Sequence, residues 1–268
     1  MSAWAGDVRM IKIASHSPPH SLAHVQSLFP QLQLVAAVDA RASDAAAAAQ
    51  AGDLSLAAYR SIRFGRTQHA QLPTMGALGL FLSWRTALLG DGPLLLLEED
   101  CVCSAHLRQV LDEFEAMDLD VGMIGTIAFG GQPAARPDWV VNPTMAFQTH
   151  CVVFSPSGRT TVREYVTTHA ADLQVDMLLV TLSQIGAIRL GVCHARVAAQ
   201  VARVSTIQTS AQRIPPDAMM AMPAQAGSSW TTPICAIAIL CIVVAATGWL
   251  LCAKAAVHAP SRRDAIDG

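Results

Sequence analysis

Three consecutive carboxylates, Glu98, Glu99 and Asp100, follow a run of four leucines and are the residues best suited to chemistry. Adjacent carboxylates repel one another, and directly after a buried strand they need water, a cation or a base to screen them. The carboxyl ends of strands are also where open α/β sheets bind ligands. Hard divalent cations take oxygen ligands and complete their shell with substrate phosphates. The run predicts a metal–diphosphate site, although on these residues alone a solvated acidic loop before a helix is the commoner outcome.

Other candidate residues have simpler interpretations. Cys101, Cys103 and His106 lie close in sequence, but they lack the ligand count and spacing of a soft-metal site, so packing cysteines are the favoured interpretation. His150 lies in an apolar run, which is typical of a hydrogen-bonded core histidine. Asp176 precedes an apolar helix that it could cap. The sequence contains no GxSxG nucleophile elbow, no P-loop and no GxGxxG, so those motifs support no assignment.

The elements that must position these residues alternate along the chain. Apolar runs predict strands, and helical apolar spacing between an N-cap candidate and a glycine predicts helices. The predicted strands are 8–14, 32–39, 94–97, 121–129 and 147–155, and the predicted helices are 21–29, 43–52, 74–90, 104–114, 157–170 and 175–186. The alternation predicts an α/β sandwich built on a mostly parallel sheet.

Composition and charge limit the partners. The 268 residues carry 18 Lys and Arg against 20 Asp and Glu, which gives a net charge of -2. Binding to nucleic acid requires a basic excess that neutralises phosphates, so no nucleic-acid partner is expected. Only 14% of the residues are charged, whereas about 25% is usual in soluble domains, so part of the chain is expected outside water.

A twenty-residue run without charge, 233–252, accounts for much of this excess hydrophobicity. As a helix it spans about 30 Å, enough to cross a bilayer, with Trp230 and Trp249 near its ends. A buried core helix is the weaker alternative because such helices rarely lack a polar stripe over this length. The predicted organisation is a globular domain at 1–210, a linker at 211–229, a transmembrane helix at 230–253 and a polar tail at 254–268.

The predicted localisation is a membrane, with a single C-terminal anchor. The first residues contain no apolar run of signal-peptide length, and the cysteines form no disulfide framework, so we expect a cytosolic globular domain. Lys254, Arg262 and Arg263 follow the anchor and favour the opposite orientation under the positive-inside rule.

Five segments occur in the order of the motifs of glycosyltransferase family 25, which includes lipooligosaccharide and collagen galactosyltransferases. They are MGALGLFLSWRTALL, LLLLEEDCVCS, TMAFQTHCVVFSPSG, LQVDMLL and HARVAAQVARVSTIQ. The family has a glycine-bearing helix with a Ser-His pair, an ILEDD strand end, a GTHAY strand, a PxD segment and a Pro/Gln/Ser ending. The chain resembles this pattern over residues 8–210 through order and spacing, since no single motif is specific. The resemblance implies a GT-A-like, nucleotide-sugar-binding sandwich.

The resemblance also implies site residues. Glu98, Glu99 and Asp100 match the acidic motif that binds Mn²⁺ or Mg²⁺ and the sugar-nucleotide diphosphate, and Asp176 matches the acid of the PxD segment and is the candidate base. The residues that match nucleotide-sugar-binding positions are Asp39, Gly76, Gly79, Ser83, Thr149 and His150, and Gln200 and Ser205 match the ending. The implied reaction is an inverting transfer of a sugar from a nucleotide sugar, with a UDP-sugar as the expected donor, to a glycan or protein hydroxyl.

Departures from the family pattern keep other functions open. Trp84 stands where the family has His after Ser, Glu99 is one methylene longer than the family's Asp, and the opening strand ends in SHSPPH instead of an Asn-Leu and arginine-rich run. The alternative function is a catalytically inactive glycosyltransferase-like domain that serves as a binding or structural membrane protein. A metal-dependent phosphohydrolase is a third hypothesis, without a nucleophilic Asp or partner Lys motif to support it.

Overall fold

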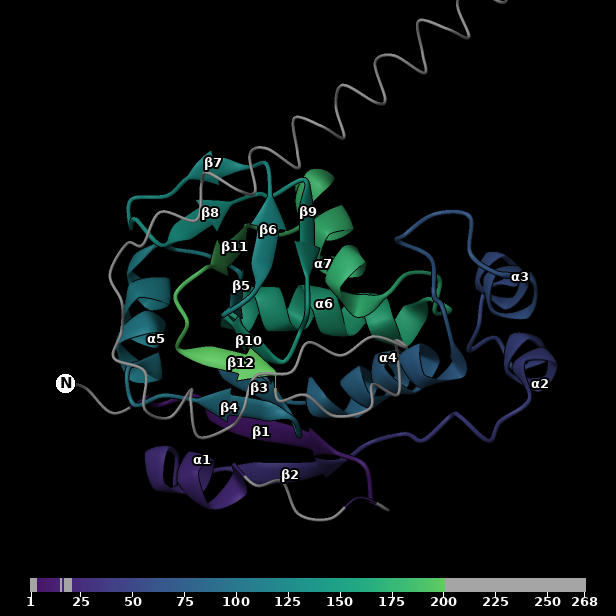
Figure 1. Cartoon of the computed structure of the whole chain (residues 1–268), viewed down its shortest axis with the longest axis horizontal. Coiled ribbons are helices and arrows are strands. Elements are labelled where there is room, and N and C mark those ends of the chain that lie inside the picture. Colours follow the sequence, from purple (N-terminus) through teal and green to yellow (C-terminus); the bar gives the residue numbers. More distant parts are fainter. Residues whose placement is uncertain (1–3, 15, 17–20, 201–268) are drawn as a thin grey trace, which may run out of the picture. The chain divides into compact units, whose positions relative to one another are not determined.

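A large mixed sheet organises the part of the chain that the computed structural model describes, residues 4–14, 16 and 21–200 (Figure 1). Its strands are β1 (Asp7–Lys12), β2 (Gln33–Ala36), β3 (Leu94–Glu98), β5 (Val121–Ile124), β7 (Gln132–Pro133), β8 (Trp139–Val141), β10 (Cys151–Phe154) and β11 (Leu190–Cys193). Two small sheets pair β4 (Cys101–Cys103) with β12 (Ala198–Gln200) and β6 (Ile127–Phe129) with β9 (Met145–Phe147). The helices are α1 (Leu22–Leu28), α2 (Ala45–Gln50), α3 (Leu56–Phe64), α4 (Met75–Ala87), α5 (Leu107–Ala116), α6 (Pro156–Thr168) and α7 (Val175–Gln184).

The large sheet has the order β2-β1-β3-β10-β5-β11-β8-β7. The pairs of β1 with β2, β1 with β3 and β5 with β11 are parallel, whereas β10 runs antiparallel to both β3 and β5. The pairs β11–β8 and β8–β7 are antiparallel as well. The expectation of a mostly parallel sheet is therefore wrong. A strand buried on both faces has the same apolar composition in either direction, so its sequence does not reveal its orientation.

Helices cover both faces of this sheet, and β3 shows how the sequence achieves it. Leu94 and Leu96 pack into a core with α4, α6 and α7, whereas Leu95 and Leu97 pack into a second core with α1 and α5. Successive side chains of a strand point to opposite faces, so an uninterrupted leucine run suits a strand that is covered on both sides. The α/β sandwich predicted from the alternation of elements is confirmed.

Two long predicted strands, 121–129 and 147–155, are each interrupted by a left-handed residue. Gly125 has a φ of 70° and separates β5 from β6, and Gln148 has a φ of 77° and separates β9 from β10. A Cβ at Gly125 would lie 2.0 Å from the carbonyl oxygen of Ala198, so the glycine also lets β12 pass closely. Both interruptions lie near the carboxylates at the end of β3, because β12 and the segment before β10 contact that end.

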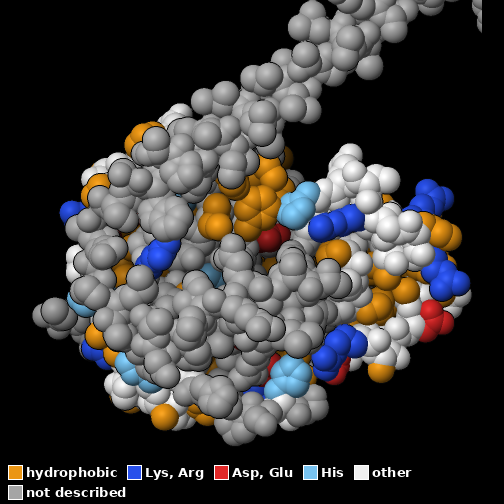
Figure 2. Space-filling model, viewed as in Figure 1, with side chains coloured by type: hydrophobic (Ala, Val, Ile, Leu, Met, Phe, Trp, Pro, Cys, Tyr) orange, Lys and Arg blue, Asp and Glu red, His pale blue; other side chains and the backbone are white. Residues whose placement is uncertain are grey.

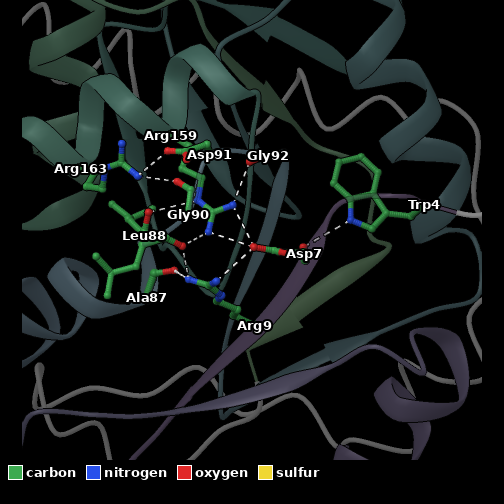
Figure 3. A network of polar contacts seen from close by, with 11 residues as sticks. Trp4, Asp7, Arg9, Ala87, Leu88, Gly90, Asp91, Gly92, Arg159 and Arg163 are labelled. Atoms are coloured by element: carbon green, nitrogen blue, oxygen red, sulfur yellow. Dashed lines mark hydrogen bonds and ion pairs between the residues drawn. The ribbon is translucent and has the colours of Figure 1, made fainter.

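Arg159 of α6 joins three elements at the opposite end of β3 (Figure 3). Its side chain is fully buried and donates from Nε to the Leu88 carbonyl at 3.1 Å, from Nη1 to the Gly92 carbonyl at 2.9 Å, and from Nη2 to Asp7 Oδ2 at 3.0 Å. Nη2 also donates to the carbonyl of Leu89. The guanidinium satisfies carbonyls at and after the end of α4, which helix geometry leaves without partners. Arg159 therefore connects the segment between α4 and β3 to Asp7 of β1.

The predicted linker, transmembrane helix and polar tail, residues 211–268, lie outside the described residues. Among the residues that the structure describes, no helix has both the length and the apolarity needed to cross a membrane. The predicted span at 230–253 therefore stays a prediction from the sequence.

Candidate functional site

Carboxylates from two elements meet where β3 ends. Glu98 closes β3, Asp100 follows in the turn before β4, and Asp176 lies in the first turn of α7. The charges of Asp100 and Asp176 both act on Glu98, which places the three side chains in one electrostatic cluster. The predicted roles of Glu98 and Asp100 as metal ligands and of Asp176 as the base stay predictions.

The three consecutive acids nevertheless take three different partners. Thr149 donates from Oγ1 to Glu98 Oε1 at 2.7 Å, and Gln200 donates from Nε2 to Asp100 Oδ2 at 2.8 Å. Glu99 is paired with the imidazole of His16. Glu99 and Asp100 form the turn between β3 and β4, and Glu99 is directed toward the end of β1, where the backbone N–H of Ile13 donates to its Oε2 at 3.2 Å. Glu98 and Asp100, together with Asp176, form the acidic cluster, and Glu99 belongs to a separate contact with His16.

Burial and mutual repulsion change the protonation of this cluster. Burial is the main cause that raises the pKa of Glu98 to about 8, and the charges of Asp100, Asp176 and Glu99 raise it further, while the hydrogen bond from Thr149 opposes the shift. Burial also raises the pKa of Asp176. Glu98 therefore holds a proton at neutral pH unless a positive charge arrives, and a cation that takes carboxylate oxygens would release that proton.

Asp176 is held from two directions. Its Oδ1 accepts from the backbone N–H of Met177 at 2.7 Å, within the first turn of α7, and its Oδ2 accepts from the N–H of Gln148 at 3.4 Å. The strained φ of Gln148 thus turns its N–H toward the acid, and Thr149, the next residue, reaches Glu98. His69 acts on Asp176 by its charge and packs edge-on against Phe147, with ring centroids 5.0 Å apart. Asp176 contributes to the helix N-terminus and also faces the acidic cluster.

A second group of charges lies beside Glu99. Asp39 follows β2 and accepts from Arg41 Nε at 2.6 Å; this bond is the main cause that lowers the pKa of Asp39 to about 2. The charge of His16 lowers the same pKa, and the charge of Glu99 raises that of Arg41, so the four side chains share one region. Lys12 at the end of β1 fixes the adjoining loop by donating to the His16 carbonyl at 2.7 Å. The Asp39–Arg41 ion pair therefore lies beside Glu99 and His16 at the carboxyl ends of β1 and β2.

The predicted nucleotide-sugar residues of α4 support the backbone that carries Asp39. Ser83 is buried; its Oγ accepts from the N–H of Val38 at 2.8 Å and donates to the carbonyl of Gly79 at 2.7 Å. A Cβ at Gly79 would lie 2.4 Å from the Val38 carbonyl oxygen, so the glycine permits close packing of α4 against the end of β2. Gly76 lies in the first turn of α4. Gly79 and Ser83 therefore position the Asp39 segment.

His150 and the cysteines behind the acids belong to the core. His150 is 1% exposed, and burial lowers its pKa to about 4. The nearby Ala198 backbone counteracts this shift without forming a hydrogen bond of good geometry, and among the described residues neither ring nitrogen has a partner. Cys101 and Cys103 are fully buried, with sulfurs 3.6 Å apart, as the packing interpretation predicts. Within the described part of the chain, no group of three or more His, Cys, Asp or Glu side chains is arranged to hold a metal ion.

A cavity of about 190 Å³ lies at the other end of the strands. Its lining includes Trp4, Pro93, Phe114 and Ser155, and Pro93 directly precedes β3, whereas the acidic cluster follows it. The cavity contains none of the acids of the cluster. The charged groups and their coupling, rather than the size of a cavity, define the candidate site.

No family model matches this chain, and no curated protein matches it. Among solved structures, UDP-glucose pyrophosphorylase complexed with UDP-glucose is 9% identical with a TM-score of 0.39, covering 70% of this chain and 89% of that chain. A197 from STIV is 9% identical with a TM-score of 0.37, covering 69% and 81%. HddC from Yersinia pseudotuberculosis, complexed with GMP-PN, is 10% identical with a TM-score of 0.36, covering 73% and 93%. Similarity at this level identifies no family, so the residues of the site carry the functional conclusion.

Trp84 is a packing residue. Its side chain extends from α4, is fully buried in the core and packs edge-on against Phe154, with ring centroids 5.8 Å apart. Its indole N–H makes no hydrogen bond within the described residues. The position where the resembled family has a histidine is thus used here for packing.

Replacing Trp84 by His will therefore lower the free energy of unfolding by about 3 kcal/mol without raising any turnover, because a large buried ring is lost and a polar one is buried. Chemical denaturation and a donor-hydrolysis assay measure the two effects. Trp84→Phe is the matched control and should cost less, since it keeps an aromatic ring and removes an unpartnered N–H. A clear rate increase in Trp84→His would refute the packing role.

Proposed function

We propose that the acidic cluster is the active site of a membrane-anchored glycosyltransferase that moves a sugar from a nucleotide sugar, a UDP-sugar above all, to a hydroxyl of a glycan or protein. The observation that supports this most directly is the convergence of Glu98, Asp100 and Asp176 at the carboxyl end of β3. Each of these acids is oriented by a polar partner, namely Thr149, Gln200 and the Gln148 N–H. A solvated acidic loop without a function would not require a separate hydrogen-bond donor for each carboxylate.

Glu98 and Asp100 would hold a Mn²⁺ or Mg²⁺ ion together with the diphosphate of the donor. Two carboxylates are enough for such an ion when substrate phosphates supply further oxygens, which is compatible with the lack of a three-residue metal group among the described residues. Because burial and the neighbouring carboxylates raise the pKa of Glu98, a bound cation would favour the ionised carboxylate that coordinates it. When bound, the ion would neutralise the charge that develops on the leaving diphosphate.

Asp176 would take the proton of the acceptor hydroxyl. Burial raises its pKa, which brings a carboxylate closer to the range useful for a general base. Its bonds to Met177 and Gln148 fix the carboxylate in place and leave it further acceptor capacity. Asp39 would remain ionised beside Arg41 and accept from hydroxyl groups of the donor's nucleoside.

The test is donor hydrolysis by the full chain with Mn²⁺, screened across UDP-, GDP- and CMP-sugars. We expect hydrolysis of one donor class, with Asp176→Asn lowering the rate at least 100-fold, because a positioned base contributes about 10²–10⁴. Asp112→Asn, an exposed change on α5, is the matched control and should leave the rate unchanged. Equal rates in both variants would exclude Asp176 as the base.

A catalytically inactive binding protein is the second candidate function, favoured by the packing role of Trp84. Binding alone predicts that UDP with Mn²⁺ raises the Tm of the full chain while no donor is hydrolysed. Hydrolysis together with the Tm shift supports the transferase, and the lack of both counts against both proposals.

The membrane anchor has its own test. Deleting every residue after Gly227 should move the protein from the carbonate-resistant membrane fraction to the soluble fraction, because the deletion removes the uncharged run 233–252. Fractionation of cells that express the full and shortened chains measures this. Continued carbonate resistance of the shortened chain would show that the anchor lies elsewhere.

A further inference from the structure

The short helix α3 has one face fixed in the core and one face exposed. Ala58 and Ser61 are buried, and Ser61 donates to the Leu72 carbonyl at 2.9 Å. Tyr59 and Ile62 are partly buried against the same core. These contacts determine which residues point outward.

The outward residues are Leu56, Arg60, Arg63 and Phe64, spaced four, three and one apart, and thus share one side of the helix. Phe64 is 78% exposed and Leu56 is 60% exposed, the largest and third-largest fractions among the exposed large hydrophobic side chains of the described residues. Arg66 follows the helix and is exposed too. We call these five residues the α3 face. It combines bulky apolar side chains with three positive charges.

No acidic residue of α3 itself offsets the charge of the α3 face. From Leu54 to Gly90 the sequence contains four arginines and no Asp or Glu. No ion pair within the described residues involves Arg60, Arg63 or Arg66. The acids near the helix have other partners: Asp53 pairs with Arg85 at 2.6 Å, Asp44 caps α2, and Asp172 accepts from the hydroxyl of Ser55, the N-cap of α3, at 2.5 Å. Figure 2 shows Lys and Arg side chains beside hydrophobic ones in the region where Figure 1 places α2 and α3.

We propose that the α3 face docks on the headgroup region of an anionic membrane. The arginines fit lipid phosphates and carboxylates, and Phe64 and Leu56 fit the boundary between headgroups and acyl chains. A net charge of -2 and one exposed aromatic ring give little basis for nucleic acid, which needs a basic track and stacking partners. The predicted span at 233–252 would keep the chain at a bilayer, where such lipids are abundant. This surface is separate from the acidic cluster, so the proposal does not rest on sugar transfer.

The test follows amide hydrogen exchange of residues 54–68 in the full chain, mixed with nanodiscs of phosphatidylcholine alone or with phosphatidylglycerol added. We expect several-fold slower exchange in the anionic nanodiscs, because docking covers α3. Arg63→Glu and Phe64→Ser should each abolish the difference, whereas Arg63→Lys should keep most of it. Arg136→Glu makes the same charge change at an exposed position between β7 and β8 and should leave the difference intact.

Each other outcome overturns the proposal. Equal exchange of α3 in both kinds of nanodisc excludes anionic lipid as the partner. An equal loss in Arg136→Glu and Arg63→Glu shows that overall charge, rather than the α3 face, is responsible. Slower exchange on adding RNA, without an effect of phosphatidylglycerol, assigns the face to nucleic acid. Exchange of β3 and β10, in the centre of the sheet, verifies that every variant is folded.

Discussion

Replacing Arg159 by methionine will lower the free energy of unfolding by about 2–4 kcal/mol, because backbone carbonyls at and after the end of α4 lose their donor, at about 1–3 kcal/mol for each group left unsatisfied in the interior. The carbonyl of Leu88 loses a buried donor, and the carbonyl of Gly92 loses a partly buried one. Asp7 loses its contact with Arg159 at 3.0 Å but adds little to the cost, since its side chain is 40% exposed and keeps Arg9 at 3.1 Å. Urea denaturation of the full chain in detergent, monitored by tryptophan fluorescence, measures the change.

Arg163→Met is the matched control. Arg163 contacts Asp91, whose side chain is 90% exposed, so water replaces the lost bond and the cost should stay under about 1 kcal/mol. Both substitutions lie on α6, so a loss of helix propensity would affect them equally. Similar costs for the two variants would contradict the role of Arg159 as the buried connection between α6, β1 and the end of α4.

The second large effect concerns Mn²⁺, pH and Glu98. The folded state holds the Glu98 proton up to a pH of about 8, whereas the unfolded chain releases it near the ordinary value of 4.5. Stability therefore falls as pH rises through this window, by up to a few kcal/mol, because the folded state must give up a proton it binds more tightly. Mn²⁺ binds the ionised form, so it should raise the Tm more at a pH of about 8 than at about 6.

Glu98→Gln mimics the protonated carboxyl and separates this group from every other titration. Its Tm should lose the component of pH dependence between about 5 and 8 and should not respond to Mn²⁺ with UDP. Asp100→Asn should also abolish the Mn²⁺ and UDP response, at little cost in stability. Glu99→Gln is the matched control, since Glu99 is paired with His16 outside the acidic cluster. An unchanged Mn²⁺ and UDP response in Glu98→Gln and Asp100→Asn would remove the proposed metal site.

The sequence predicts the elements with strong local signals and misses those that depend on distant contacts. The predicted helix at 74–90 corresponds to α4, and the hydroxyl of Thr74 caps it by accepting from the Ala77 N–H at 3.3 Å. The helix expected from 104 begins at Leu107. The sequence carries no local signal for the short strands β4 and β12, because each has three residues and exists through its pairing with the other. Strand direction also depends on distant pairing, as β10 shows.

The candidate site was predictable in part for the same reason. The acids after the leucine run were visible because three charges directly after an apolar strand are unusual. The sequence does not reveal that Glu99 turns toward His16, because this contact requires the end of β1 to lie beside the end of β3. Gln148 gives no signal in the sequence, because its role comes from a left-handed backbone and not from its side chain. Residue types indicated the chemistry, and the three-dimensional contacts separated positioning residues from those that face the acidic cluster.

The pairing of β12 with β4 has a consequence during synthesis on the ribosome. Gln200, which orients Asp100, lies 100 positions after it, so the nascent chain carries Asp100 without this partner while those 100 residues are translated. At about 5–20 residues per second this interval lasts roughly 5–20 seconds. During this interval the three adjacent carboxylates, which repel one another, are exposed to cellular cations before the hydrogen-bond donor of Asp100 has been translated. A chain released by premature termination just before β12 would keep the large sheet but lack the last support of its acidic cluster.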